Sequence, residues 1–189
     1  MRKIDDELAM GGFLSSASNL DSGLGTIFLS DMLWPNVAED RYSRAIKIPE
    51  GIITVTITAP NGDMVTTDDK ELYLYLVRKT LDRAKANNIP DREISITLDD
   101  YLNDTQQDCF PAADQMIVDS LRRLQATQFK LDIEVQGTGV LRLFKMIASF
   151  NYDYELIGER NVIKSFRVRH SDLLYEFLAG KSSMDPSGC

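Results

Sequence analysis

The chain has 189 residues, of which 43% are hydrophobic and 26% are charged, and its formal net charge is −8. This length and composition are typical of one soluble globular domain with a sizeable core. No stretch approaches the 18 or so uninterrupted apolar residues of a membrane-spanning helix, and the acidic balance argues against a diffuse nucleic-acid coat.

The N-terminal segment and the cysteines predict where the protein works. Acidic residues occupy positions 5–7, where a signal peptide would have its apolar run. The two cysteines, Cys109 and Cys189, lack metal-ligand spacing, which favours a reducing compartment. We therefore expect a cytoplasmic protein.

The predicted organisation is an arm, one domain and a tail. Residues 1–26 are rich in Gly and Ser, which predicts a flexible N-terminal arm. A single domain is expected over residues 27–180, and residues 181–189 form a polar tail or linker. The only tryptophan, Trp34, lies in an apolar segment that packs either on this domain or on a partner.

Strand-like stretches open the domain at residues 44–49 and 51–67. In the second stretch threonines alternate with apolar residues, which is the period of a half-buried strand. The Pro-Asn-Gly-Asp sequence at residues 60–63 is a strong turn signal and predicts a β-hairpin.

Helices and strands alternate in the rest of the chain. Asp68, with Glu71 as its capping-box partner, Thr97 and Ser171 are the predicted helix N-caps. The expected elements are helix 69–88, strand 93–98, helix 98–103, helix 112–126, strand 129–135, strand 140–157, strand 162–170 and helix 172–179.

This order of elements is that of a winged helix. Helices 98–103 and 112–126 form the helix-turn-helix, and the hairpin that turns at residues 137–139 forms the wing. We therefore predict an α+β fold, a winged helix-turn-helix with an extra N-terminal β-hairpin.

Catalytic motifs are missing from the sequence. The single histidine, His170, cannot form a His-His metal pair, and no GxxxxGK[ST] sequence is present to bind a nucleotide. The acidic pairs at residues 68–69 and 99–100 stand at predicted helix starts, where they stabilise the helix dipole. We expect no enzymatic activity, no metal and no cofactor.

Basic residues are enriched in the second half of the chain. Residues 113–170 hold nine basic and seven acidic side chains, whereas residues 1–112 hold eleven and nineteen. In helix 112–126 the apolar residues, Met116 among them, are expected in the core. Gln115, Asp119 and Arg122 fall on or near one outer face, and Gln and Arg are residue types that read adenine and guanine edges.

The Arg122-Arg123 pair has two interpretations. One is a solvated helix face on which Asp119 pairs with either arginine. The other is the end of a recognition helix, where Arg122 contacts bases and Arg123 contacts phosphate or supports the structure. The predicted DNA-binding residues are Gln107, Gln115, Asp119, Arg122, Arg123, Lys130, Arg142, Lys145, Arg160, Arg167 and Arg169.

Several short motifs follow one another along the domain. They are Asp69-Lys70-Glu71, Leu74-Tyr75-Leu76, Thr97, Asp100-Tyr101-Leu102, Ser120-Leu121, Arg123-Leu124, Thr127, Phe129, Ile133, Phe144 and Met146-Ile147. In this order and spacing they resemble the N-terminal winged-helix domain of plasmid replication initiators of the replication initiator protein A (RepA) family. The resemblance covers about residues 67–178. It departs from the family at residues 109–112, where the family has small residues and glycine, and it lacks the second winged helix.

The resemblance implies a replication initiator domain of a plasmid or other mobile element. Such a domain binds double-stranded repeats of an origin sequence-specifically, as a homodimer, and recruits host replication proteins. Two alternatives stay open. The domain is either a dimerisation module, with residues 1–112 and Trp34 forming the partner surface and DNA read elsewhere, or a winged-helix transcriptional regulator.

Overall fold

The computed structural model describes residues 33–36, 41–48, 51–59, 63–87, 90–106, 113–135 and 137–179. The predicted arm over residues 1–26, the tail over 181–189 and Gln107 lie outside these ranges. Within them the fold is mixed α+β, as predicted, and its strands form two antiparallel sheets. No helix in the described ranges is long and apolar enough to cross a membrane.

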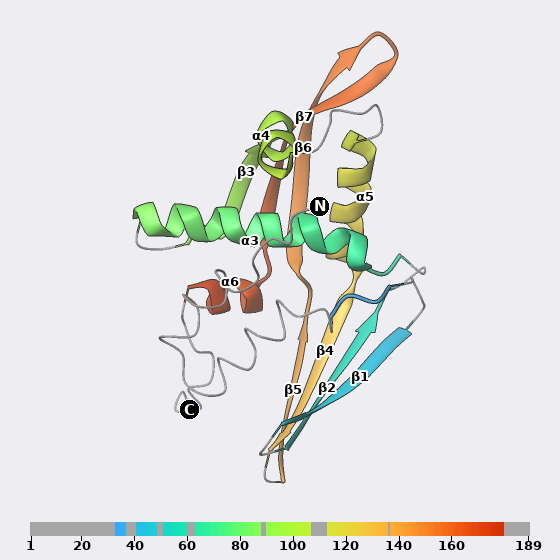
Figure 1. Cartoon of the computed structure of the whole chain (residues 1–189), viewed down its shortest axis with the longest axis vertical. Helices are drawn as coiled ribbons and strands as arrows, with labels where there is room; N and C mark the ends of the chain where they lie inside the picture. The colour runs from blue at the N-terminus through green and yellow to red at the C-terminus, as the bar shows by residue number, and fades with distance from the viewer. Residues whose placement is uncertain are drawn as a thin grey trace.

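A four-stranded sheet has the strand order β1-β2-β4-β5, and a three-stranded sheet has the order β3-β7-β6. In Figure 1 the two sheets lie towards opposite ends of an elongated molecule, with helix α3 running across the region between them. The elements are β1 Arg41–Ile48, β2 Gly51–Thr58, α3 Thr67–Asn87, β3 Glu93–Thr97, α4 Leu98–Thr105, α5 Ala113–Ala126, β4 Gln128–Val135, β5 Thr138–Phe144, β6 Ile147–Ile157, β7 Arg160–His170 and α6 Asp172–Leu178.

One face of the four-stranded sheet is buried in the core. Alternate residues of β2 lie directly opposite alternate residues of β4. A slip of one residue would turn this apolar set towards solvent, so the burial fixes the register. The buried set is Ile53, Val55, Ile57, Phe129, Leu131 and Ile133.

The N-terminal hairpin exists, but the turn predicted at residues 60–63 does not make it. The hairpin consists of β1 and β2, which pair antiparallel. Residues 63–66 carry no strand. Both edges of β2 are already occupied, by β1 and β4, and Met64 and Val65 are instead fully buried in the core.

The predicted strand over residues 140–157 is two strands in two different sheets. Its first part, β5, pairs with β4, and its second part, β6, pairs with β7. The break falls where Met146 and Ile147 are both fully buried, which interrupts the alternation of the strand.

The predicted wing at residues 137–139 is therefore wrong. That hairpin belongs to the four-stranded sheet with β1 and β2, whereas β3, the strand next to α4, pairs with β7. The sheet to which each hairpin belongs depends on pairing between strands that are distant in the sequence. The turn signal at residues 137–139 indicates only that a hairpin is present.

The predicted caps of two short helices are confirmed. The Thr97 hydroxyl accepts a hydrogen bond from the Asp100 N–H at 3.1 Å, and the Ser171 hydroxyl accepts one from the Leu174 N–H. The cap of α3 differs from the prediction, because the helix starts at Thr67 and the Asp69 carboxylate accepts the Thr66 N–H at 2.9 Å. Asp69 is thus the capping-box acid, two residues before the predicted Glu71.

Trp34 and His170 belong to the core. Trp34 is 2% exposed and packs on Tyr73, with 5.2 Å between ring centroids, so it packs on its own domain. His170 Nε2 lies 2.7 Å from the Thr80 hydroxyl, which itself donates to the Leu76 carbonyl. Burial lowers the pKa of His170 to about 4, which keeps the ring neutral.

Candidate nucleic-acid interface

Helix α5 is attached to the start of α3 by a buried ion pair. The Asp69 side chain is 0% exposed, and the Arg123 guanidinium donates to both of its oxygens, Nε to Oδ2 at 2.9 Å and Nη2 to Oδ1 at 2.7 Å. The Ser120 hydroxyl and the Thr66 N–H donate to the same carboxylate. The hydrogen bonds between Arg123 and Asp69 raise the pKa of Arg123. Together, the four donors give the Asp69 carboxylate the partners that a buried charge requires.

A second buried contact fixes the C-terminal end of α5. The hydroxyl of Thr127, a fully buried residue directly after the helix, accepts the Val65 N–H at 3.0 Å. Because Val65, just before α3, and Asp69, in its first turn, thus hold α5 at two points, the helix has one defined rotation about its axis.

The side of α5 that lies opposite its buried stripe of Ile117, Leu121 and Leu124 presents three connected polar side chains to solvent. The Gln115 Nε2 donates to Asp119 Oδ1 at 2.8 Å, and Arg122 Nη1 donates to the same oxygen at 3.0 Å. This confirms that the three residues share one face. The two arginines differ, since the Arg122 side chain is 57% exposed and that of Arg123 is 29% exposed.

Met116 also lies on the outside of α5, which corrects its predicted place in the core. It is 58% exposed. At 3.6 residues per turn, it stands about 100° round the helix from the buried stripe formed by Ile117, Leu121 and Leu124. Plotting that angle from the sequence would have found it.

The β6–β7 hairpin runs alongside α5 and is joined to it at both ends. Near the C-terminus of α5, Gln125 Nε2 donates to the Ala148 carbonyl at 3.4 Å. Near its N-terminus, Arg160 Nη2 donates to Asp114 Oδ1 at 2.8 Å. Figure 1 shows the hairpin rising beside α5 and extending beyond it.

The tip of this hairpin is a tight turn at Gly158 and Glu159. Gly158 has φ +63°, and Glu159 is not among the described residues with positive φ. A positive φ at the first central position alone is what a type II′ turn requires, and it favours glycine there.

Some of the predicted DNA-binding residues lie away from α5. Arg167 and Arg169 are on the outer face of the three-stranded sheet, opposite Ser95 and Glu93 of β3, and Arg167 Nε lies 3.6 Å from the Glu93 carboxylate. Their neighbours along β7 are buried, so these arginines face away from the helices.

The remaining predicted cations are near or on the four-stranded sheet. Lys130 is on its outer face, 3.8 Å from the Asp132 carboxylate. Arg142 is on β5 opposite Leu131, and Lys145 is exposed between β5 and β6. The structure therefore brings together Gln115, Asp119 and Arg122, with Arg160 at the N-terminal end of the same helix.

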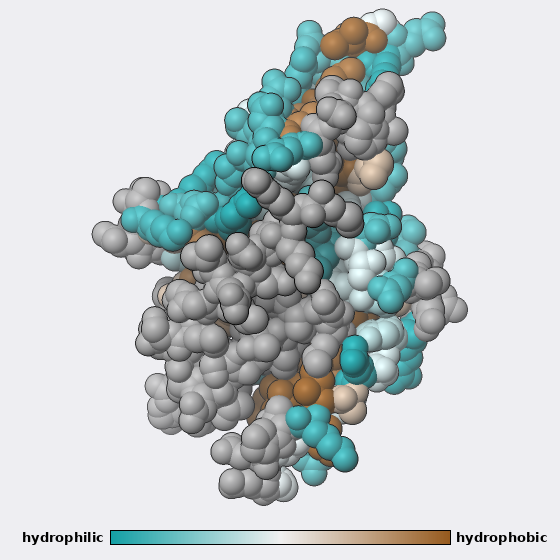
Figure 2. Space-filling view, in the orientation of Figure 1, coloured by the Kyte–Doolittle hydropathy of each residue, from teal (hydrophilic) through white to brown (hydrophobic). Residues whose placement is uncertain are grey.

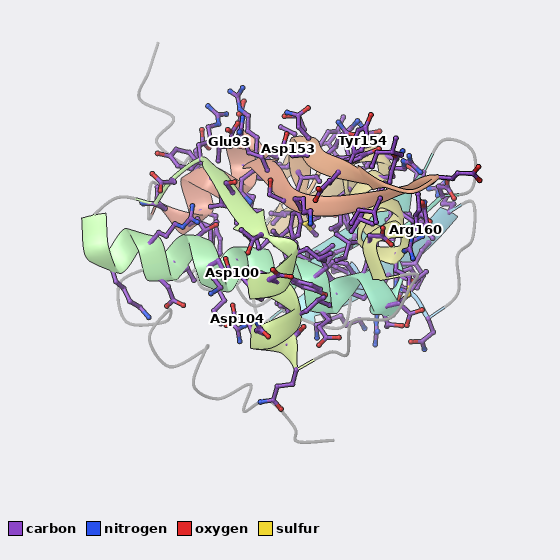
Figure 3. The ribbon with its side chains drawn as sticks, turned by 90° about the horizontal axis from the view of Figure 1, so that it is seen from above. Glu93, Asp100, Asp104, Asp153, Tyr154 and Arg160 are labelled. Atoms are coloured by element: carbon purple, nitrogen blue, oxygen red, sulfur yellow. The ribbon has the colours of Figure 1, made fainter. Side chains whose placement is uncertain are left out.

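Acidic residues of α4 have structural partners. The Asp104 carboxylate accepts the Tyr75 hydroxyl at 2.9 Å and lies 2.7 Å from Lys79 Nζ, which joins α4 to α3. The hydrogen bond from Lys79 lowers the pKa of Asp104. In Figure 3, Asp100 and Asp104 are seen on α4, apart from Arg160 beside α5. Among the residues that the structure describes, no three His, Cys, Asp or Glu side chains gather as metal ligands.

Comparison with known proteins identifies relatives of this arrangement. The family model "Replication initiator protein A" matches residues 35–184. A structure of domains 2 and 3 of RctB is similar with a TM-score of 0.62 and 16% identity, covering 82% of this chain and 58% of that one. A selenomethionine derivative of the same two domains gives a TM-score of 0.59 and 16% identity, covering 78% and 56%. The chain thus spans little more than half the length of these structures, and no curated protein matches it significantly.

The two neighbouring arginines should differ in their effect on stability. Replacing Arg123 with Ala leaves the Asp69 charge buried without its main partner, so we expect the free energy of unfolding to fall by about 3–5 kcal/mol. Arg122→Ala is the matched control, because it removes an exposed pair and should change stability by about 0.5 kcal/mol or less. Urea unfolding measures both. Equal losses for the two variants would show that the Asp69 contact does not hold α5.

Proposed function

The chain belongs to the replication initiator protein A family, and from this premise we propose that its described domain binds double-stranded origin DNA sequence-specifically. The outer face of α5 enters the major groove. The observation that carries this proposal is the exposed network of Gln115, Asp119 and Arg122 on a helix whose other side is fixed through Arg123.

The proposed binding unit is a winged helix formed by α3, β3, α4, α5, β6 and β7. Its support is the strand order β3-β7-β6, which places the strand between the first two helices against the last strand. In this unit the β6–β7 hairpin is the wing, and the β4–β5 hairpin is an insertion that joins β1 and β2 in the other sheet. Helix α5 is the recognition helix.

The chemistry of the face suits base recognition better than general attraction to phosphate. Amide and guanidinium groups pair with adenine and guanine edges, and a carboxylate accepts from cytosine N4. Asp119 and Asp114 neutralise Arg122 and Arg160, so this face has little excess positive charge for sequence-independent binding. Binding is non-covalent and needs no cofactor.

Because the face has little excess positive charge, we expect this domain alone to bind weakly and to gain affinity from a second DNA-binding unit. A dimer mate or a further domain of a longer initiator raises affinity through effective concentration. Within a plasmid or other mobile element, such a protein binds iterated origin repeats in the cytoplasm and recruits host replication proteins. Membership of the initiator family favours this role over that of a promoter-binding transcriptional regulator.

A second candidate function, homodimerisation, is favoured by the four-stranded sheet. Ile52, Leu141 and Leu143 are 41%, 55% and 60% exposed, and their register places them on the face turned away from the core. Among the described strands β5 is also at the edge of its sheet, and an edge strand can pair with a strand of another chain. This surface includes the N-terminal hairpin but not Trp34, which is buried.

Replacing the exposed leucines of β5 with charged residues should abolish a dimer that uses the outer face of the four-stranded sheet. The double change Leu141→Glu and Leu143→Glu places two like charges on each partner, so sedimentation should show a monomer where the unmodified protein is a dimer. Leu156→Glu, at a site 64% exposed on the other sheet, is the matched control and should remain a dimer. A double variant that still dimerises excludes this face.

The DNA affinities of single-residue variants should distinguish side chains that contact bases from those that contact phosphates. We expect Arg122→Ala to weaken binding to the cognate repeat by about 1–3 kcal/mol and to relax specificity at one position. Arg160→Ala should instead lower affinity on every sequence, because Arg160 lies at the N-terminal end of α5 and is the expected phosphate contact. Lys85→Ala, at the far end of α3, removes a surface cation without effect and controls for net charge. Gel-shift titrations on cognate and scrambled duplexes measure these differences, and unchanged binding for Arg122→Ala would show that α5 does not read the bases.

A further inference from the structure

Every second residue of β6 from position 150 to 156 is aromatic or apolar. The rings of Phe150 and Tyr152 lie 6.5 Å apart between centroids, and those of Tyr152 and Tyr154 lie 6.4 Å apart. Exposure rises along the strand, from half-buried Phe150 to 39% for Tyr152, 57% for Tyr154 and 64% for Leu156. The three outer side chains, Tyr152, Tyr154 and Leu156, are called the β6 strip below.

The β6 strip lies between buried residues of β7 and the outer edge of the described sheet. Tyr152 lies opposite Phe166 and Tyr154 opposite Ile163, and these two β7 residues are 1% and 5% exposed. β6 is an edge strand of its sheet, so nothing in the sheet covers its other side. Figure 2 shows apolar side chains following the hairpin towards its tip.

The acidic residues of β6, Asp153 and Glu155, lie on the opposite face of the strand from the β6 strip. Successive side chains of a strand point to opposite faces, so Asp153 and Glu155 are turned away from Tyr152 and Tyr154. The Asp153 carboxylate also accepts the Ser165 hydroxyl at 3.0 Å, and Glu155 lies 2.9 Å from Lys164 Nζ. Figure 3 shows Asp153 and Tyr154 next to each other along the strand. The described carboxylates of β6, Asp153 and Glu155, are therefore paired and lie on the other face of the strand from the tyrosine rings.

We propose that the β6 strip is a binding site for an unpaired DNA strand, whose bases stack on Tyr152 and Tyr154. The proposal rests on the proposed function, because a protein bound at an origin lies beside the strands that separate when the duplex opens. Stacking on aromatic side chains tolerates any base and needs only one ring for each base. The nearby cations, Arg122 and Arg160, are each paired with an aspartate of α5, so stacking on the rings is expected to contribute more than attraction to the backbone.

The size of the strip favours a single strand over a protein partner. Three half-exposed side chains offer on the order of 300 Å², since a whole aromatic side chain buries about 150–250 Å². A stable protein interface needs about 800 Å² from each partner. A single strand needs no such area, because each stacked base contributes independently.

Fluorescence anisotropy with a labelled 12-nucleotide single strand of mixed sequence, and with the cognate duplex, tests the site. Tyr152→Ala and Tyr154→Ala should each weaken single-strand binding by about fivefold or more, whereas duplex affinity stays within about twofold. Tyr154→Phe keeps the ring and should bind as the unmodified protein does. Circular dichroism and thermal unfolding of each variant confirm that the hairpin is folded.

The outcomes separate this site from the proposed duplex binding. Unchanged single-strand affinity in the alanine variants, an equal loss on duplex, or a change in self-association without a change in single-strand binding overturns the stacking site. Duplex binding that depends on Arg122 without any single-strand binding overturns the site and leaves the proposed function intact. Single-strand binding through the tyrosines without duplex recognition overturns the proposed function and supports the site.

Discussion

The arrangement of this protein depends on one buried carboxylate. Asp69 is completely inaccessible to solvent, and an isolated charge in such a place costs several kcal/mol. The cost is offset only when the first turn of α3 and the third turn of α5 are both in position, because one supplies the Thr66 N–H and the other supplies Ser120 and Arg123. Asp69 therefore ties two helices, far apart in the sequence, into one geometry.

The position of the recognition face follows from that contact. With Arg123 turned inwards to Asp69, Gln115, Asp119 and Arg122 are left on the outside of α5. The β6–β7 hairpin is placed in turn by α5, through the contacts at Gln125 and Asp114. The orientation of both proposed DNA contacts, the helix face and the β6 strip, therefore depends on Asp69, a side chain that belongs to neither.

The sequence predicted well what local chemistry decides. The caps at Thr97 and Ser171, the extent of α5 and the shared face of Gln115 and Arg122 follow from short-range spacing, and all are present. The family was also recognised from the order of short motifs, and the family model confirms it.

The features that could not be predicted from the sequence depend on contacts between residues far apart in the chain. Asp69 looked like a helix-dipole acid because its partner, Arg123, is 54 positions away. Residues 140–157 look like one strand in the sequence because apolar residues recur throughout. The break between β5 and β6 is visible only from their pairing partners, β4 and β7. The link between Arg160 and Asp114 likewise joins a hairpin tip to a helix, and no local pattern indicates it.

The central claim is that the outer face of α5 contacts the bases of double-stranded DNA. Site-specific photocrosslinking tests it most directly, with a photoreactive phenylalanine derivative at position 116 on α5 or at position 151 on the outer face of the three-stranded sheet. Both native residues, Met116 and Asn151, are exposed, so the two substitutions are matched in their tolerance. The account predicts crosslinks from position 116 to bases inside the cognate repeat and none from position 151. Crosslinks from position 151 without any from position 116 would contradict it.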